Sequence, residues 1–343
     1  MQYITYDSTT TYNRTILTQL KGDTVSARYP VRLTDYYVGL IRHQDDAIWK
    51  QCMPDARELE DESQVPDPLH ESALSPVPGL IHRYPDRVVL LVSNRCAVYC
   101  RFCMRKRLVG GGDAPMGEAE LHAALDYIAA HPAIHDVVLS GGDPLMLDDE
   151  SLSTILTGLR AIPHVSIIRI GTRVPVTLPG RITRELCSLL RTFHPLFINT
   201  HFNHPDEITA ASENACALLA DSGIALGNQT VLLREVNDSV ETMRKLMTGL
   251  LALRVRPYYL HQMDLVQGTA HFRTSVRTGL EIMRGLRGHV SGLAVPHYVI
   301  DLPGGKGKVA ILPDDVKIQG NTLLLRTYTG EQVLYEDITT PQG

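Results

Sequence analysis

The sequence lacks the features that would place it in several large classes of protein. No apolar stretch approaches the ~20 residues that a membrane-spanning helix needs. The segment from Met1 to Arg14 is polar, so we expect no secretory signal peptide. Lys and Arg number 33 against 38 Asp and Glu, which gives no basic footprint for nucleic acid. These absences favour a soluble enzyme that binds neither membranes nor nucleic acids.

Cysteine is scarce as well. Six cysteines in 343 residues do not make a disulfide scaffold, and reduced thiols are typical of the cytoplasm, where we expect the protein to act. Cys52, Cys187 and Cys216 are scattered along the chain. The last two fall in helical patterns, and we expect them to be small core residues.

The three remaining cysteines, Cys96, Cys100 and Cys103, form a CxxxCxxC stretch. A [4Fe–4S] cube needs four ligands, usually thiolates, so three cysteines leave one iron open to a molecule that reacts there. A structural zinc site needs four closed ligands, and no fourth Cys or His follows at zinc-finger spacing. The stretch therefore predicts an iron–sulfur centre, with a zinc site as the less favoured alternative.

Strand and helix patterns alternate from Val88 onward. Six short runs read as strands: Val88–Val92, Asp136–Leu139, Val165–Ile170, Leu196–Thr200, Ile224–Thr230 and Pro257–His261. Amphipathic helical patterns lie between them, and strand starts recur about every 30 residues, the size of a βα unit. Short apolar strands between such helices predict a parallel sheet buried on both sides. We expect an α/β fold with a partial (β/α)6 barrel over residues 81–292. A doubly wound sheet is the alternative that the pattern leaves open.

A different kind of segment precedes the predicted barrel. Residues 1–80 contain a helix-like stretch from Tyr36 to Met53 and then an acidic, proline-rich connector from Glu58 to Pro78. Proline-rich polar stretches are typical of loops. We expect an N-terminal helical and irregular segment whose connector is exposed.

The segment that follows the barrel, residues 293–343, begins with a glycine-rich turn from Pro303 to Lys308. Two β-like runs then flank Gly320-Asn321, a pair that is typical of a hairpin turn. We expect a small C-terminal β appendage that lies over the mouth of the barrel.

The cysteine stretch directly follows the first predicted strand, at the end where barrel enzymes build their active sites. In this position CxxxCxxC resembles the signature of the radical S-adenosylmethionine (SAM) superfamily, which implies a [4Fe–4S] cluster and SAM. The second strand ends in Gly141, Gly142 and Asp143, where glycines permit close approach of a ligand. Such a turn alone is common, but after CxxxCxxC it resembles the turn that binds the SAM amino group. Gln229, at the end of the fifth strand, is a further expected SAM contact.

Longer stretches resemble one family within that superfamily, the lysine 2,3-aminomutases. They run in order from about Asp67 to Pro313 and include residues 78–87, 103–107, 199–205, 226–233 and 257–259. The resemblance implies a second cofactor, pyridoxal phosphate (PLP), bound by the lysine that ends a glycine turn. Lys308 matches that lysine, while Lys306 stands where the family has a glycine. Arg83 and Arg87 match positions near the PLP phosphate, and guanidinium groups suit phosphate.

The resemblance also implies a substrate. Asp264 and Asp301 match the two aspartates that receive the side-chain ammonium of lysine, and Arg105 matches the residue that pairs with its carboxylate. Glutamate-specific members have a cationic residue and an amide at the two aspartate positions. We therefore predict an isomerase that converts L-lysine to β-lysine by 1,2-amino migration. Breaking the unactivated C–H bond is beyond a side-chain base and requires cofactors.

Several alternatives and partners remain at this stage. The short chain and His261 resemble a sister group that forms β-lysine for modifying elongation factor P, and another amino acid could be the substrate. An iron–sulfur electron-transfer or sensor protein is a remote alternative. We expect an external electron donor of flavodoxin or ferredoxin type and a homo-oligomer. Ser239 replaces a zinc-binding cysteine of the long aminomutases, and no cysteine follows Cys216, so we expect no zinc.

Overall fold

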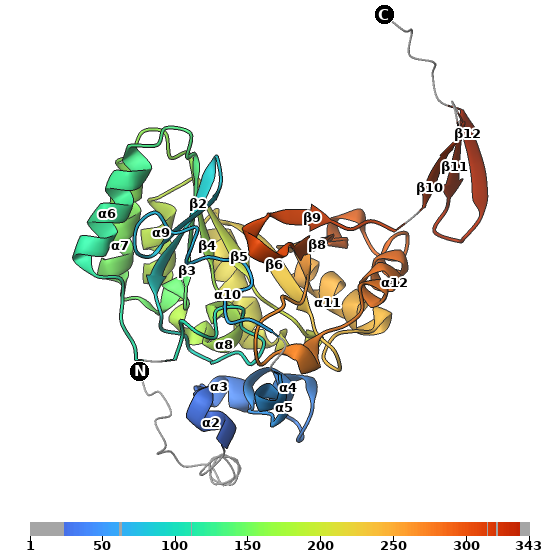
Figure 1. The fold of residues 1–343 in the computed structure, drawn as a ribbon, viewed down its shortest axis with the longest axis horizontal. Coiled ribbons are helices and arrows are strands. Elements are labelled where there is room, and N and C mark those ends of the chain that lie inside the picture. Colours follow the sequence, from blue (N-terminus) through green and yellow to red (C-terminus); the bar gives the residue numbers. More distant parts are fainter. Residues whose placement is uncertain (1–23, 62–63, 111, 314, 320–321, 337–343) are drawn as a thin grey trace, which may run out of the picture.

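The computed structural model describes residues 24–61, 64–110, 112–313, 315–319 and 322–336. In this part of the chain, the central element is a curled sheet of nine strands whose order follows the sequence (Figure 1). Seven of them are parallel: β2 (Arg87–Ser93), β3 (Asp136–Gly141), β4 (Ile167–Gly171), β5 (Leu196–Thr200), β6 (Ala225–Leu232), β7 (Val255–Gln262) and β8 (His297–Asp301). The edge strands β1 (Leu80–Tyr84) and β9 (Lys308–Ala310) run antiparallel to β2 and β8.

This strand order decides between the two expected architectures. A doubly wound sheet reverses its strand order near the middle, whereas β1 to β9 follow one another without reversal. The partial barrel is therefore confirmed, with its six predicted strands as β2 to β7. β8 is a further parallel strand that the sequence pattern did not reveal, because it is short and leads into the glycine turn instead of a helix.

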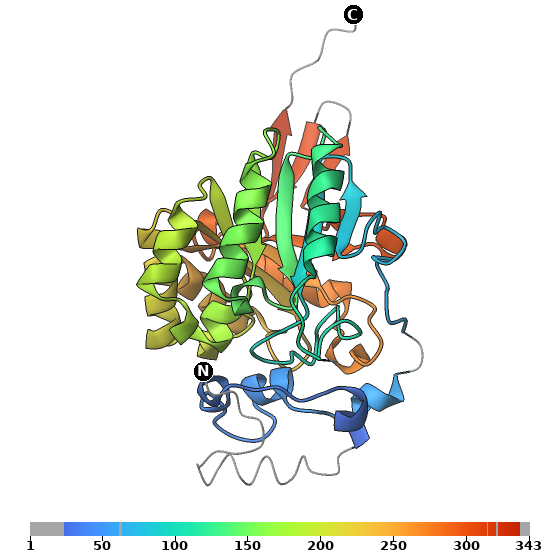
Figure 2. The ribbon, with the colours of Figure 1, turned by 90° about the vertical axis from the view of Figure 1, so that its left-hand side faces the viewer.

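Helices cover the convex face of the sheet (Figures 1 and 2). They are α6 (Glu118–Ala129), α7 (Asp149–Arg160), α9 (Arg184–Arg191), α10 (Ala210–Asp221), α11 (Val240–Ala252) and α12 (Val276–Leu286). The short helix α8 (Val174–Thr177) lies instead at the end of the barrel, where Thr34 Oγ1 donates to Thr177 O at 2.6 Å (Figure 1). In β2, the side chains of Val88, Leu90 and Val92 are fully buried, while alternate residues are half-buried. The half-buried set faces the concave side, where the functional groups lie.

Four short helices precede the barrel: α2 (Thr24–Arg28), α3 (Asp35–Val38), α4 (Ala47–Cys52) and α5 (Arg57–Glu60). They lie across one end of the barrel (Figures 1 and 2). The prediction of one helical stretch between Tyr36 and Met53 is wrong, because α3 and α4 are separate helices. Asp45 takes a left-handed φ of 63° and Asp46 caps a new helix, accepting from Ile48 N at 2.9 Å and Trp49 N at 2.7 Å.

The connector between residues 58 and 78 is only partly exposed, which corrects the expectation. Glu58, Asp61, Leu69 and Glu71 are buried. Glu58 and Glu71 are buried because cationic side chains of the cysteine loop pair with them, while Asp61 accepts hydrogen bonds from the backbone N–H groups of Gly268 and Ala270. A sequence window does not contain those partners.

Beyond β9, three strands form a separate antiparallel sheet: β10 (Val316–Gln319), β11 (Thr322–Arg326) and β12 (Gln332–Glu336). Pairing of Gln319 with Thr322 confirms the expected hairpin, although Gly320 and Asn321 lie outside the described residues. The expected position over the mouth is wrong. Tyr328 packs on Gly288 and His289, just after α12 ends, at the end of the barrel opposite the N-terminal helices (Figures 1 and 2). No helix among the described residues is long and apolar enough to cross a membrane.

Candidate active site

The loop that contains the three cysteines begins where β2 ends. The N-terminal segment holds its backbone, since Tyr99 N donates to Arg32 O and Arg101 N donates to Gln51 O, each at 2.9 Å. Arg101 and Glu58 are completely buried and form an ion pair of 2.8 Å, and Lys106 Nζ reaches Glu58 at 2.7 Å. The segment expected to be irregular therefore clamps the cysteine loop in place.

The cysteine side chains are half-buried. Burial, followed by the charge of Cys100, raises the pKa of the Cys103 thiol to about 11. Arg173 Nη1 donates to Cys100 Sγ at 2.8 Å, and Arg105 N donates to Cys103 Sγ at 3.3 Å. Hydrogen bonds of this kind favour the thiolates that a cluster requires.

The arrangement of the donors bears on which metal group fits. Among the described residues, no set of three or more His, Cys, Asp or Glu side chains converges on a single ion. Each thiolate of an iron–sulfur cube binds a different iron, so its three sulfur atoms need not converge. Three thiols on one loop, with donors aimed at two of them, fit such a cube.

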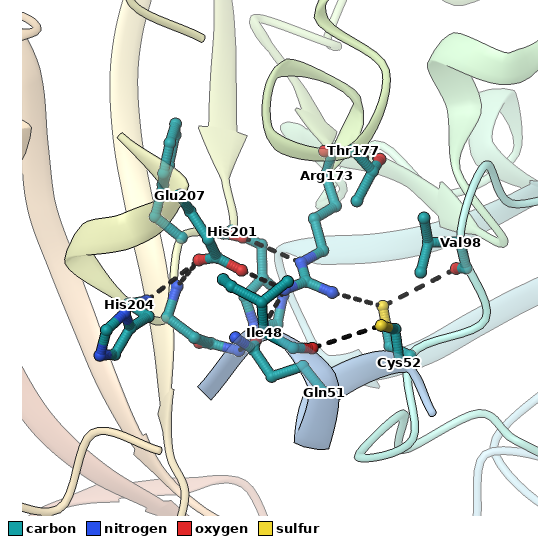
Figure 3. A network of polar contacts seen from close by, with 12 residues as sticks. Ile48, Gln51, Cys52, Val98, Arg173, Thr177, His201, His204 and Glu207 are labelled. Atoms are coloured by element: carbon teal, nitrogen blue, oxygen red, sulfur yellow. Dashed lines mark hydrogen bonds and ion pairs between the residues drawn. The ribbon is translucent and has the colours of Figure 1, made fainter. Parts of the chain in front are cut away.

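Arg173 is the centre of a buried network at the end of β4 (Figure 3). In addition to Cys100, its guanidinium donates to Glu207 Oε1 at 2.6 Å, Gln51 Oε1 at 2.7 Å, Tyr37 Oη at 3.0 Å and His201 O at 3.2 Å. The network joins the N-terminal helices to the loops that follow β4 and β5. Sequence reasoning missed Arg173, although a charged residue directly after a predicted barrel strand could have indicated it.

The glycine turn after β3 lies against the cysteine loop. A Cβ atom on Gly141 would lie 2.3 Å from Ser93 O, and one on Gly142 would lie 2.4 Å from Arg95 O. The Asp143 carboxylate accepts hydrogen bonds from Thr172 Oγ1 at 2.7 Å and from Arg173 N at 2.6 Å. These glycines are required by the contact between two loops, and Asp143 bonds to the loop that follows β4. Binding of SAM by this turn and by Gln229, a half-buried residue of β6, stays a prediction.

Lys308 stands at the other side of the mouth, where the glycine turn between β8 and β9 ends. Its backbone N–H donates to Tyr84 Oη at 2.8 Å, and its Nζ donates to Asp301 Oδ1 at 2.8 Å. Gly304, Gly305 and Gly307 have φ values of 75°, 73° and 94°, a region that favours glycine. Lys306 is exposed. Lys308 is exposed as well, but its Nζ contacts Asp301, which directs it at another predicted site residue.

The two predicted substrate aspartates have contrasting surroundings. Asp301 lies next to three basic groups: Lys308 Nζ at 2.8 Å, Arg83 Nη1 at 3.3 Å and His261 Nδ1 at 3.4 Å. Burial opposes its ionisation, but His261 and Lys308 together lower the pKa of Asp301 to about 2. For Asp264, burial and then the charge of Asp301 raise the pKa to about 7. The structure therefore places these two carboxylates close enough to interact, with His261 next to Asp301.

The two predicted phosphate-binding arginines lie on β1 and β2, beside the lysine turn. Arg83 Nε is buried and has no hydrogen-bond partner in the described part of the chain. Arg87 lies over the Tyr84 ring at 4.6 Å, and its Nε is 3.1 Å from Asp86. The unpartnered N–H of Arg83 suits a phosphate group, and the amino group of the nearby Lys308 suits an aldehyde. This donor set therefore fits PLP.

Arg105 is the third predicted substrate contact and lies between the two sides. Its Nε and Nη2 donate to the Glu71 carboxylate at 3.1 Å and 2.7 Å, and its Nη1 donates to Ser140 Oγ at 3.1 Å. Among the predicted residues, the structure therefore gathers Lys308, Asp264, Asp301, Arg83 and Arg105 around the mouth. Glu71 was missed because it lies in the connector expected to be exposed.

Comparisons with known proteins find two family profiles and several relatives of high sequence identity. The profile described as Radical SAM superfamily matches residues 90–247, and the one described as Lysine-2,3-aminomutase matches residues 283–340. L-lysine 2,3-aminomutase of Fusobacterium nucleatum is 50% identical over 309 residues, which are 89% of this chain and 73% of that one. The enzyme of that name from Clostridium subterminale is 51% identical, covering 89% and 74%. Glutamate 2,3-aminomutase of Clostridioides difficile is 45% identical, covering 91% and 75%.

Proposed function

The chain belongs to the lysine 2,3-aminomutase family of radical SAM enzymes, and on this premise we propose that it converts L-lysine to β-lysine. Since a glutamate enzyme is also 45% identical, the substrate has to be argued from the site. The observation that supports lysine is the pair of carboxylates, Asp264 and Asp301, close enough for one to raise the pKa of the other. Two carboxylates can share one ammonium group through charge-assisted hydrogen bonds.

The cofactors implied by the family are a [4Fe–4S] cluster, SAM and PLP, which together supply a radical and stabilise the migrating nitrogen. Cys96, Cys100 and Cys103 would hold the cluster, leaving one iron for SAM. Lys308 would bind PLP through its amino group. Arg83 and Arg87 would receive the phosphate, while Gly141, Gly142, Asp143 and Gln229 would border SAM.

The chain's own residues would bind and orient the substrate from both ends. Arg105 would receive the α-carboxylate with the N–H groups that Glu71 and Ser140 leave free. Asp264 and Asp301 would receive the side-chain ammonium. A glutamate side chain would instead place a third carboxylate beside two others in a partly buried site, where unpaired charge is costly. The site is therefore selective through repulsion as well as attraction.

The N-terminal helices have a protective role in this proposal. They bury the cysteine loop through Arg101, Glu58 and Arg173, whose side chains are at most 8% exposed. A site that generates a radical needs water and other reactants kept out until substrate is in place. The same helices would therefore shield the reaction from solvent.

Three partner and location assignments complete the proposal. Cluster reduction requires one electron from outside, so an external donor of flavodoxin or ferredoxin type is included. Val316, Ile318 and Leu334 of the β10–β12 sheet are 51%, 74% and 69% exposed, and exposed apolar groups of this kind favour association of the chain into a homo-oligomer. All six cysteines are free thiols, which suits the cytoplasm.

An anaerobic assay tests the proposed reaction. The reconstituted protein is incubated with SAM, PLP, a chemical reductant and single amino acids, and products are identified by mass spectrometry and chiral separation. We expect β-lysine from L-lysine, with little turnover of glutamate or alanine. Faster turnover of glutamate or alanine than of lysine would refute the assignment.

A further inference from the structure

The turn from Asp67 to Leu74 links the two sides of the mouth. Pro68 O accepts a hydrogen bond from Gly304 N at 2.8 Å, and a Cβ on Gly305 would lie 2.7 Å from Leu69 O. This turn therefore lies directly against the glycine turn that leads to Lys308. The Asp67 carboxylate accepts from Glu71 N and Ser72 N, each at 3.0 Å, and fixes the conformation of the turn.

Glu71 extends from this turn to Arg105. Their side chains are 5% and 14% exposed, and the carboxylate receives Nε and Nη2 of the guanidinium side by side. Burial disfavours the charged guanidinium, but the Glu71 carboxylate outweighs it and raises the pKa of Arg105. Three of the five guanidinium N–H groups are then occupied by Glu71 and Ser140. The two others, one on each terminal nitrogen, remain available for a second acceptor.

The site needs such a restraint because it holds opposite charges in one buried space. Arg105 and Asp264 are close enough to affect each other's pKa. Left to themselves, a buried guanidinium and a buried carboxylate would pair. That pairing would remove both the anion-binding and the cation-binding group from an amino acid substrate.

We propose that Glu71 is a positioning residue that fixes the Arg105 guanidinium and presents its remaining N–H groups to the substrate carboxylate. This inference rests on the proposed function, because it takes Arg105 as the carboxylate contact. A purely electrostatic role would have the opposite sign: removing a negative charge beside Arg105 would strengthen its attraction for an anion. The direction of the change on mutation therefore separates positioning from charge.

The test compares two ligands that differ only at the group Arg105 is proposed to bind. L-lysine has an α-carboxylate, whereas L-lysinamide keeps both amino groups and has a neutral amide. Their affinities are measured anaerobically, without SAM, from the change in absorbance of the PLP bound to the cluster-containing enzyme. We expect the wild type to prefer lysine by about tenfold or more. Glu71→Gln should weaken lysine binding and reduce this preference to near unity.

A structural loss alone would weaken both ligands and leave their ratio unchanged. Asp55→Asn is the control, because it removes one carboxylate that pairs with Arg57 and lies outside the turn that carries Glu71, and its preference should equal that of the wild type. Glu71→Asp, which keeps the charge at shorter reach, should give an intermediate preference and provides the decisive comparison if Glu71→Gln does not load its cofactors.

The outcomes separate this inference from the proposed function. If Glu71→Gln, or Glu71→Asp in its place, keeps the wild-type preference or binds lysine more tightly, the positioning role is wrong while lysine conversion can still stand. If the wild type itself does not prefer lysine to lysinamide, the assignment of Arg105 fails and the role of Glu71 fails with it.

Discussion

The cysteine side and the lysine side of the mouth treat their buried charges differently. On the cysteine side, the protein supplies the partners. Arg101 and Glu58 are fully buried and paired with each other, and the Arg173 guanidinium is surrounded by acceptors (Figure 3). On the lysine side, Nε of the Arg83 guanidinium is buried without a hydrogen-bond partner among the described residues. Buried imidazole nitrogens in that state occur on both sides, Nε2 of His261 here and Nε2 of His201 on the cysteine side.

Within the lysine side, the two aspartates differ in the same way: Asp301 has basic partners in the protein, whereas burial and a neighbouring carboxylate disfavour the charged form of Asp264. Asp301 is ionised at any ordinary pH because basic groups surround it, whereas Asp264 has a pKa of about 7. A buried polar group without a partner is costly. Where the structure keeps such a group, a ligand is the natural partner. The cysteine side is thus built to hold its loop rigidly, and the lysine side is built to be completed by what it binds.

The largest expected effect comes from removing a cluster ligand on the cysteine side. Cys100→Ala should abolish cluster binding and SAM cleavage, since a cube cannot be held by two thiolates in this loop. Iron content after anaerobic reconstitution measures this, with about four irons per chain expected for the wild type. Cys187→Ala is the control: Cys187 is 2% exposed in the core and should leave the iron content unchanged. Retention of the cluster in Cys100→Ala would contradict the assignment.

The next largest effect is expected from removing the lysine that is proposed to bind PLP. Lys308→Ala should lose all PLP that borohydride can trap and reduce lysine turnover at least ~1000-fold, because the group that binds the cofactor is gone. Thermal stability should change little, since Lys308 Nζ is partly exposed, with its side chain 30% accessible. Lys306→Ala should keep the trapped PLP. Peptide mapping that finds PLP on Lys306 would reverse the roles of the two lysines.

A third change separates stability from binding. Glu58→Gln should destabilise the fold by about 3–5 kcal/mol, because Arg101 and Lys106 would be left buried without their shared anion. Asp55→Asn, which breaks an exposed pair with Arg57, should cost less than about 1 kcal/mol. Denaturant unfolding measures both. Equal losses in the two variants would show that the buried triad does not clamp the cysteine loop.

The smallest effect concerns the pH dependence of the lysine side. The ammonium group of lysine pairs with ionised Asp264, so binding below pH 7 must expel a proton from a group whose pKa is about 7. The dissociation constant of lysine should therefore rise by up to about tenfold per pH unit as the pH falls below 7. Asp264→Asn should bind lysine more weakly and lose this component of the slope. Identical pH profiles for wild type and Asp264→Asn would rule out Asp264 as the titrating contact.

Much of the barrel and of the site could be predicted from the sequence, for local reasons. The six strands β2 to β7 appear as apolar runs between amphipathic helices, because a parallel strand covered on both faces needs apolar residues throughout. CxxxCxxC indicates its chemistry because three ligands on one short loop require no long-range information. Lys308, Asp264, Asp301 and Arg105 came from the resemblance to the family, and the structure then placed them around one mouth.

The errors arose where the partner of a residue is distant in the sequence. Glu58 and Glu71 look like residues of an exposed acidic connector, but Arg101 and Arg105 bury them from more than thirty positions away. Arg173 looks like an ordinary loop residue until Gln51, Glu207 and Cys100 converge on it from three other segments. The β10–β12 sheet was placed at the wrong end because strand patterns do not show where a hairpin packs.

By itself, the sequence determined which chemistry this protein can perform: its local patterns specify the strands, the cluster loop, and the residues that match the family. Only the tertiary structure decided how those residues are held, with three basic groups beside Asp301, a raised pKa at Asp264, and an ion pair between Glu71 and Arg105. The physical reason is that the state of a buried charge depends on the distance to its nearest opposite charge and on the exclusion of water. Both are properties of the packed chain, and neither can be read along the sequence.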